Sequence, residues 1–160
     1  MLIRMAQMED LDDITQLEAV CFPPLEAAGK ASFKTRLEAF SESFLLAVED
    51  GKIIGFVNGG VTDDKIIADE MYANTSLHNP NGAYQAIFGL DVHPDYRNQG
   101  IAAKLMNELI ELTRTRGKKG LILTCKDKLI HYYETFGYVN MGLSESKHGG
   151  AVWYDMILEF

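Results

Sequence analysis

The sequence has few cysteines and no long apolar run. Cys21 and Cys125 are the only two cysteines in 160 residues, and they lack the spacing of a metal site or a redox motif. We therefore expect free, buried thiols, with neither a disulfide nor a metal centre. No apolar stretch is long enough to cross a bilayer, and the N-terminal residues meet acidic side chains by Glu9, unlike a signal peptide. We expect a cytoplasmic protein without contact to a membrane.

Basic residues are also scarce. The chain carries 15 Lys and Arg against 23 Asp and Glu, which gives a formal net charge of -8 at pH 7. A nucleic-acid surface would show clustered basic side chains, so we expect no nucleic-acid partner, and the acidic balance favours cationic small molecules. With 47% hydrophobic and 24% charged residues, the chain has the composition of one globular domain, which we expect to span residues 1–160.

The most informative stretch runs from a strand end through a turn into a helix. It reads Leu90-Asp91-Val92-His93-Pro94-Asp95-Tyr96-Arg97-Asn98-Gln99-Gly100-Ile101-Ala102. The first amides of a helix lack intrahelical acceptors and carry partial positive charge, so a phosphate group can bind there. Gly100 has no side chain to hold an anion away. An ordinary strand-to-helix loop with a glycine fits this spacing equally well.

The remaining pattern indicates a mixed α/β fold. Apolar spacing at Leu11, Ile14, Leu17 and Val20 predicts one buried helix face, and further helices are expected over 25–40, from 101 to about 117 and over 129–136. A glycine turn at 50–51 predicts a hairpin. Residues 62–82 are expected to form a short helix and a long loop. Strands are expected at 2–5, 44–48, 52–61, 84–92, 120–125, 138–143 and 152–160.

The central stretch resembles the acyl-CoA pyrophosphate loop of the Gcn5-related N-acetyltransferase (GNAT) superfamily. Arg97, Gly100 and Ala102 fill the fixed places of its consensus, Arg/Gln-x-x-Gly-x-Gly/Ala. Two further segments resemble the arylalkylamine N-acetyltransferases, namely Leu77-His78-x-Pro80-x-Gly82 and Cys125-x-Asp127 before Tyr132-Tyr133-Glu134-Thr135-Phe136-Gly137. The resemblance covers roughly residues 77 to 143. It implies an α+β GNAT-like domain whose central, mostly antiparallel sheet has a splayed central strand pair flanked by helices.

The resemblance also implies the cofactor and its site. Acetyl-CoA is expected as the cosubstrate, without a metal. Tyr133 is expected to donate a proton to the leaving sulfur as general acid, and Arg97 to add charge near the pyrophosphate. The remaining cofactor contacts are expected from the main chain of Leu90, Asp91 and Val92, and from the amides of Asn98, Gln99, Gly100, Ile101, Ala102 and Ala103.

The resemblance fails at the base that must take a proton from the amine. The arylalkylamine enzymes have two histidines on the central strand, whereas this chain has Ala86 and Phe88, which cannot titrate. Glu26 or Glu70 is the candidate base, and Asp69, His78 and a water chain to solvent are the other options. We expect Phe22, Pro24 and Phe88, together with Phe33, to form an apolar wall of the acceptor site.

The sequence thus predicts an N-acetyltransferase that moves an acetyl group directly from acetyl-CoA to a primary amine. A small-molecule amine, an arylalkyl amine among the options, is the first choice of acceptor. A protein N-terminus or lysine is the alternative acceptor. A non-catalytic acyl-CoA-binding sensory or interaction module is the alternative from another class, because the two histidines are missing. The chain is expected to be a monomer or a homodimer.

Overall fold

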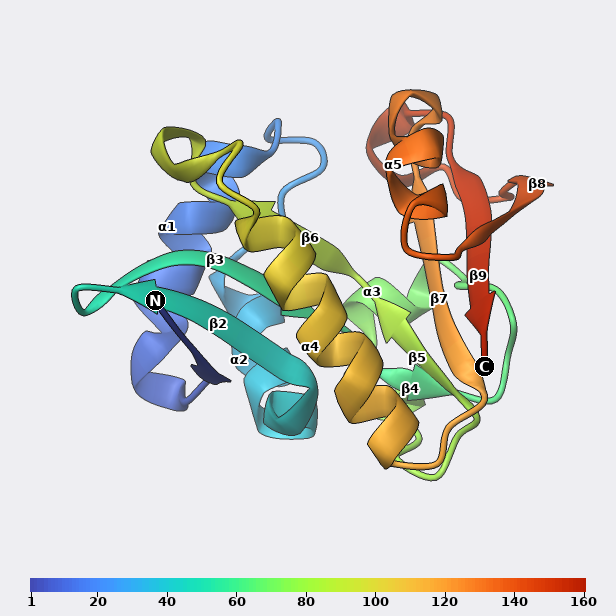
Figure 1. Cartoon of the computed structure of the whole chain (residues 1–160), viewed down its shortest axis with the longest axis horizontal. Helices are drawn as coiled ribbons and strands as arrows, with labels where there is room; N and C mark the ends of the chain where they lie inside the picture. The colour runs from blue at the N-terminus through green and yellow to red at the C-terminus, as the bar shows by residue number, and fades with distance from the viewer.

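Nine strands form two sheets that diverge in the middle of the computed structural model, which describes residues 1–160 (Figure 1). The first sheet is antiparallel, in the order β1 (Leu2–Met5), β2 (Phe44–Glu49), β3 (Lys52–Asn58) and β6 (Gly89–Val92). The second sheet has the order β4 (Val61–Thr62), β5 (Tyr84–Ile87), β7 (Gly120–Cys125), β9 (Tyr154–Glu159) and β8 (Val139–Leu143). Only β5 and β7 pair in parallel. The expected mixed fold with a mostly antiparallel, splayed sheet is confirmed.

The strand predicted over 84–92 is interrupted at Phe88. Before that residue, β5 pairs with β7; after it, β6 pairs with β3 of the other sheet. The amide of Phe88 donates to the carbonyl oxygen of Asn58 at 2.7 Å, which holds the chain at this change of partner. Beyond Phe88, β6 and β7 share no ladder of hydrogen bonds. The two sheets therefore open away from each other at this end of the molecule.

Helices cover both faces of the first sheet (Figure 1). On one face α4 (Ile101–Thr115) buries Leu105 and Leu109 against Leu45 and Val57. On the other face, α1 (Leu11–Cys21) and α2 (Lys30–Phe40) pack against the sheet in a second apolar cluster. Its aromatic rings are Phe33 of α2, Phe44 of β2 and Phe56 of β3. The two short helices, α3 (Glu70–Ala73) and α5 (Ile130–Glu134), lie beside the opening between the sheets.

Two helix predictions need correction. Val20 was expected on the buried face of α1 but is 56% exposed, because the buried face continues through Glu18. The second helix begins at Lys30 rather than at Leu25, whose side chain is 80% exposed. Pro23 and Pro24 prevent α1 from continuing. Residues 22–29 form a loop that contains a turn, and Gly29 is the N-cap of α2.

The strand predicted over 52–61 is also divided. β3 ends at Asn58 and β4 begins at Val61 in the other sheet. Gly59 makes the crossing, and a Cβ atom at this position would lie 1.8 Å from the carbonyl oxygen of Ala86. Only glycine allows the two backbones to approach so closely.

The β2–β3 turn follows the sequence directly. Asp50 and Gly51 join β2 to β3 with φ of 50° and 76°, so the hairpin prediction is confirmed.

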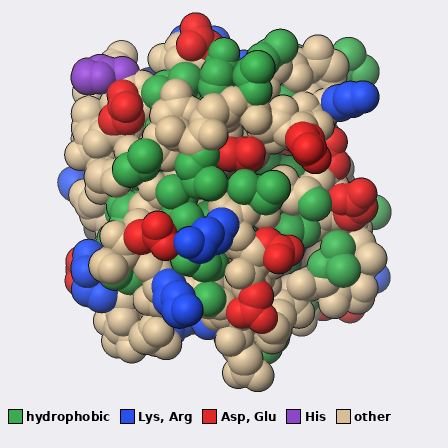
Figure 2. All heavy atoms as spheres, turned by 90° about the vertical axis from the view of Figure 1, so that its right-hand side faces the viewer, with side chains coloured by type: hydrophobic (Ala, Val, Ile, Leu, Met, Phe, Trp, Pro, Cys, Tyr) green, Lys and Arg blue, Asp and Glu red, His purple; other side chains and the backbone are tan.

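Both cysteines are free thiols; Cys125 is buried and Cys21 is half-buried. The face that carries β8 and β9 mixes apolar and charged side chains, and the edge strand β8 exposes Val139 and Leu143 there (Figure 2). None of the helices combines the length and apolarity that a membrane crossing requires.

Candidate active site

A pocket of about 450 Å³ lies where the two sheets diverge. Residues 87–90 at the end of β5 and the start of β6 line the pocket, as do residues 123–125 of β7 and the following Lys126. The rest of the lining comes from α1, α3, α5, Arg97, the segment between β7 and α5, and the loops after α1 and β8. The pocket therefore depends on the change of partner at Phe88, which separates the two central strands.

The loop before α4 has the backbone of an anion site. Asn98 and Gly100 adopt left-handed φ values of 62° and 78°, and a Cβ atom at Gly100 would meet nothing within 4 Å. The amide protons of residues 98–103 have no acceptor within the protein. The next amide along the chain, that of Lys104, donates to the carbonyl oxygen of Gly100. Six free amides at a helix N-terminus fit a pyrophosphate group. Arg97 lines the pocket, and its Nε donates to the carbonyl oxygen of Val92 at 3.2 Å.

Tyr133 projects from α5 into the pocket, while the adjacent Tyr132 does not line it. The ring of Tyr133 packs edge-to-face with Tyr132 and Tyr138, at centroid distances of 5.3 and 6.0 Å. Burial raises the pKa of Tyr133 above its ordinary value of 10.0, so the phenol stays protonated at neutral pH. A hydrogen-bond donor is therefore available at this wall.

Aromatic side chains also gather at one end of the pocket. Phe22, Phe88, Tyr72 and Trp153 are among its lining residues. The rings of Phe88 and Tyr72 lie 4.9 Å apart, and the hydroxyl of Tyr72 hydrogen-bonds with that of Thr124 at 2.9 Å. Burial raises the pKa of Tyr72 to about 12. This end of the pocket suits an apolar or aromatic group.

Two members of the expected apolar wall lie elsewhere. Pro24 is exposed and does not line the pocket, whereas the preceding Pro23 does. Phe33 is fully buried in the cluster between the helices and the first sheet. The wall is completed instead by Tyr72 and Trp153, which come from segments without a clear sequence pattern.

Three contacts close the aromatic end of the pocket. Lys126 Nζ lies 2.9 Å from Glu26 Oε2, which ties the end of β7 to the loop after α1. His148 Nε2 hydrogen-bonds with the carbonyl oxygen of Glu26 at 2.9 Å, and Trp153 Nε1 donates to the carbonyl oxygen of His148 at 2.9 Å. We call these contacts the strap. Glu26 thus lines the pocket in an ion pair.

The other two acidic candidates for the base lie outside the pocket. Glu70 is exposed and does not line it. Asp69 is also exposed, and accepts hydrogen bonds from the hydroxyl of Ser146 and, at 3.0 Å, from the amide of Lys147.

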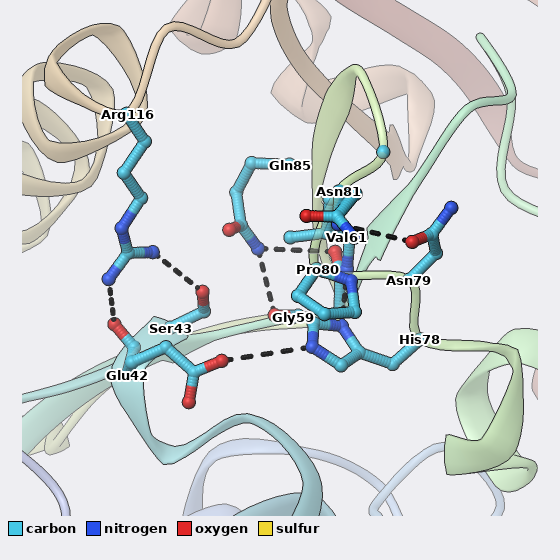
Figure 3. A network of polar contacts seen from close by, with 12 residues as sticks. Glu42, Ser43, Gly59, Val61, His78, Asn79, Pro80, Asn81, Gln85 and Arg116 are labelled. Carbon is cyan, nitrogen blue, oxygen red and sulfur yellow. Dashed lines mark hydrogen bonds and ion pairs between the residues drawn. The ribbon is translucent and has the colours of Figure 1, made fainter.

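His78 belongs to a separate polar network (Figure 3). Its Nδ1 accepts a hydrogen bond from the amide of Val61 at 2.9 Å, and its Nε2 lies 3.7 Å from the carboxylate of Glu42. Arg116, which follows α4, donates to the hydroxyl of Ser43 and to the carbonyl oxygen of Glu42. Burial lowers the pKa of His78. The network links the two sheets and lies outside the lining of the pocket.

Two buried carboxylates were not identified as candidates from the sequence. Asp91 was expected to contribute its main chain, but its side chain is only 1% exposed and neither carboxylate oxygen has a hydrogen-bond partner. Glu18 is 6% exposed and lines the pocket, and its Oε1 also has no partner. The position of Glu18 in the sequence, four residues after Ile14, places it on the apolar face of α1 and indicates its burial.

Charge and burial set the protonation of Asp91. Burial raises the pKa of Asp91 well above its ordinary value, and the nearby negative charge of Glu18 raises it further. Arg36, also buried, opposes this effect with its positive charge. No three His, Cys, Asp or Glu side chains are grouped so that they could hold a metal ion.

This fold and this site define a class of acyl-CoA-dependent transferases. The sequence model described as "Acetyltransferase (GNAT) family" matches residues 11–138, well over half of the chain. The chain therefore belongs to the GNAT acetyltransferase family.

Curated relatives share part of the sequence. Probable hydrolase YhcX of Bacillus subtilis (strain 168) is 30% identical over 142 residues, which cover 83% of this chain and 27% of that protein. Serotonin N-acetyltransferase of Mesocricetus auratus is 30% identical over 95 residues, covering 59% of this chain and 44% of that protein. The chain thus spans between about a quarter and a half of the length of these relatives.

Solved structures share the fold. A GNAT-like decarboxylase, GphF, in complex with isobutyryl-CoA superposes with a TM-score of 0.86 and 20% identity, covering 99% of both chains. The ribosomal-protein-S18-alanine N-acetyltransferase from Escherichia coli has a TM-score of 0.74 and 18% identity, covering 99% of this chain and 92% of that one. At these identities the likeness concerns the fold alone.

Proposed function

We propose that this chain transfers the acetyl group of acetyl-CoA to the nitrogen of a small cationic amine with an aromatic or apolar body. The observation that carries this proposal is one pocket lined by Arg97, which precedes a loop with six free amides, by aromatic side chains and by the buried Glu18. The family membership supports the acetyl donor, and the similarity to serotonin N-acetyltransferase supports an amine acceptor.

The residues present fit the cosubstrate. The amides of residues 98–103 would hold the pyrophosphate, and Arg97 would add a positive charge beside it. Leu90 lines the opening on β6, which has lost its neighbour on this side. The unpaired edge of residues 90–92 would place main-chain donors near the thioester carbonyl. Bound here, acetyl-CoA supplies an activated acyl group.

Each remaining residue then has a defined task. Tyr133 keeps its proton and would donate it toward the sulfur as the carbon–sulfur bond breaks. Phe22, Phe88 and Trp153 would hold the body of the amine and exclude water. The buried acidic groups at this end favour a cationic acceptor over an anionic one.

The strap favours a small acceptor over a protein. It joins three segments of the chain across the acceptor end through contacts of 2.9 Å. A protein N-terminus or lysine, the alternative acceptor, would have to enter as an extended chain and would require the strap to open. A free amine of modest size fits within the 450 Å³ that the pocket provides.

The test is release of free thiol from acetyl-CoA over a panel of arylalkyl amines, polyamines, amino acids and short peptides. We expect turnover with the arylalkyl amines. Tyr133→Phe should lower kcat by about 10²-fold or more, the usual contribution of a general acid, and should leave acetyl-CoA binding intact. Tyr132→Phe is the matched control, since Tyr132 is adjacent in α5 and outside the pocket. Binding of acetyl-CoA without turnover on any amine would favour the sensory module.

A second candidate activity is decarboxylation of a carboxyacyl-CoA, since GphF is described as a decarboxylase. The observation in its favour is that His148 and Lys126 lie at the acceptor end, where they could hold a substrate carboxylate. Against it, Lys126 is already paired with Glu26, and Glu18 lies in the same pocket. Release of CO2 from malonyl-CoA in the absence of any amine would identify this activity, and we expect none.

A further inference from the structure

Glu18 and Asp91 meet at one point beneath the pocket. Glu18 lies one turn before the end of α1, and Asp91 lies in β6. Between them, β6 begins with Gly89, which lines the pocket. A Cβ atom at Gly89 would lie 3.3 Å from Asp91 Oδ1, 3.4 Å from Asn58 Nδ2 and 3.9 Å from Glu18 Oε1. Three polar atoms thus converge where the side chain of residue 89 is missing.

These atoms lack partners although they are buried. Glu18 Oε1, both carboxylate oxygens of Asp91 and Asn58 Nδ2 have no hydrogen-bond partner when both carboxyls are ionised, and a proton on Asp91 would be shared with Glu18. The other oxygen of Glu18 accepts from the amide of Ala28 at 2.9 Å, which fixes the carboxylate and leaves Oε1 free. Buried polar groups without partners are costly, and they are retained in folded proteins where a ligand or a function uses them.

One cation faces the pair. Arg36 of α2 donates to Asn58 Oδ1 and to the carbonyl oxygen of Tyr72, both at 3.1 Å, and its guanidinium lies 5.2 Å from the centre of the Phe88 ring. The other titratable groups near the pair are Cys21 of α1 and Tyr133. Tyr72 lies beside Arg36, and the cation Arg97 lines the same pocket next to Cys21. Arg36 can balance one carboxylate only. The second negative charge is balanced either by a proton or by a cation that enters the pocket.

We propose that the Glu18–Asp91 pair binds the ammonium group of the acceptor and takes one proton from it through Glu18 Oε1. This inference rests on the proposed acetyl transfer. It assigns the base that neither Ala86 nor Phe88 can supply. Glu18, which lines the pocket, is the catalytic residue; Asp91, Asn58 and Arg36 are positioning residues behind it.

The proton balance is complete. One N–H bond of the ammonium group breaks, and its proton forms an O–H bond on Glu18. The nitrogen lone pair then forms the bond to the acetyl carbon as the carbon–sulfur bond breaks. A second proton from the nitrogen replaces the one that Tyr133 gives to the sulfur. Glu18 finally returns its proton to solvent, so the reaction releases one proton overall.

The experiment compares Glu18→Gln with Asp13→Asn, which alters an exposed acidic residue of the same helix. In the wild type, kcat should rise with pH as the pair loses the proton that the raised pKa of Asp91 keeps on it. Glu18→Gln should lower kcat by about 10²- to 10³-fold and abolish that rise, with the Kd for acetyl-CoA changed less than twofold. Glu18→Asp should retain part of the pH dependence. Asp13→Asn should behave as the wild type.

A second readout does not depend on activity. Carbon-13 NMR of the side-chain carboxyls in the full chain should show that the Asp91 carboxyl titrates well above its ordinary range, and Asp91→Asn should remove that titration. Ordinary titration of both carboxyls, or a kcat of Glu18→Gln within threefold of wild type at every pH, overturns the proposal alone. Absence of turnover with every amine overturns the proposed function and the proton transfer together. If Glu18→Gln does not fold, the titration and its loss in Asp91→Asn decide the question.

Discussion

At the scale of single residues, backbone conformation and side-chain volume have separate effects on the anion loop. Gly100 and Gly51 both have left-handed φ values, 78° and 76°, and a Cβ atom at either would meet nothing within 4 Å. The two glycines therefore impose the same conformational requirement on any replacement. They differ in place, since Gly100 adjoins the free amides of α4 and Gly51 lies in the β2–β3 turn.

This contrast leads to a prediction for Gly100→Ala. A left-handed conformation costs an L-residue roughly 1–2 kcal/mol, so Gly100→Ala and Gly51→Ala should lower the free energy of unfolding by similar amounts. Only Gly100→Ala should weaken binding of coenzyme A, by about tenfold, since one charge-assisted hydrogen bond is worth about that much. Urea unfolding and calorimetric titration measure the two effects. Equal Kd values for the two variants would show that the loop does not hold the phosphates.

Also at this scale, the buried pair shows why residue type alone does not identify a functional carboxylate. Acidic residues are mostly exposed, so the apolar pattern of α1 predicts burial of Val20 rather than of Glu18. In the structure Val20 points to solvent and Glu18 is buried. The cause is tertiary: β6 carries Asp91 and Gly89 beneath this turn of α1, and no local pattern records that contact.

At the scale of elements, the strap connects segments that are distant in the chain. Lys126 and Glu26 are 100 residues apart and form a partly buried ion pair at 2.9 Å. The exposed pair Lys30–Asp12 has the same distance of 2.9 Å, but both of its side chains are largely in solvent. Because solvent screens an exposed pair, only the first should restrain its loop measurably.

Lys126→Met tests this restraint, with Lys30→Met as the matched control. We expect the amides of residues 25–29 to exchange with solvent about fivefold faster in Lys126→Met, which corresponds to roughly 1 kcal/mol of lost restraint. The KM for the amine should rise, because the loop also carries Phe22 and Pro23 of the pocket. Hydrogen exchange followed by mass spectrometry measures the first effect. Unchanged exchange in Lys126→Met would mean that the loop is held by its own packing.

The elements also differ in how far sequence determines them. The hairpin at 50–51 and the amphipathic α4 follow from local patterns, and both lie where predicted. The loop with Arg97 and Gly100 was found by its motif. The interruption at Phe88 was not predicted, because residues 84–92 are almost continuously apolar and give no sign of a change of partner. The pocket depends on that interruption.

At the scale of the whole molecule, the two sheets are held at their closed end while they diverge at the pocket. The polar network around His78 joins the segment before β2 to β4 and to the end of α4 (Figure 3). The ring of His78 also packs 5.3 Å from that of Phe40. The network brings together residues 42, 61, 78 and 116, which are far apart in the chain, and no sequence pattern indicates that they lie close to one another.

The network predicts a dependence of stability on pH. Burial lowers the pKa of His78 from its ordinary 6.5; Lys118 contributes to the shift and Glu42 opposes it. The unfolded chain therefore binds more protons than the folded chain between the lowered pKa and about 6.5. The free energy of unfolding should decrease as the pH falls through this window, and the full contribution should be present above about 6.5.

His78→Asn isolates this contribution, since the asparagine Oδ1 can accept the hydrogen bond of Val61 without titrating. Urea unfolding at pH 7.5, 6.5 and 5.5 should give a shallower decrease in stability for His78→Asn than for the wild type, although the variant loses the packing against Phe40 and starts lower. His131→Asn is the control, because the side chain of His131 is 93% exposed and should leave the decrease unchanged. Parallel curves for His78→Asn and wild type would show that His78 does not cause the loss of stability between pH 7.5 and 5.5.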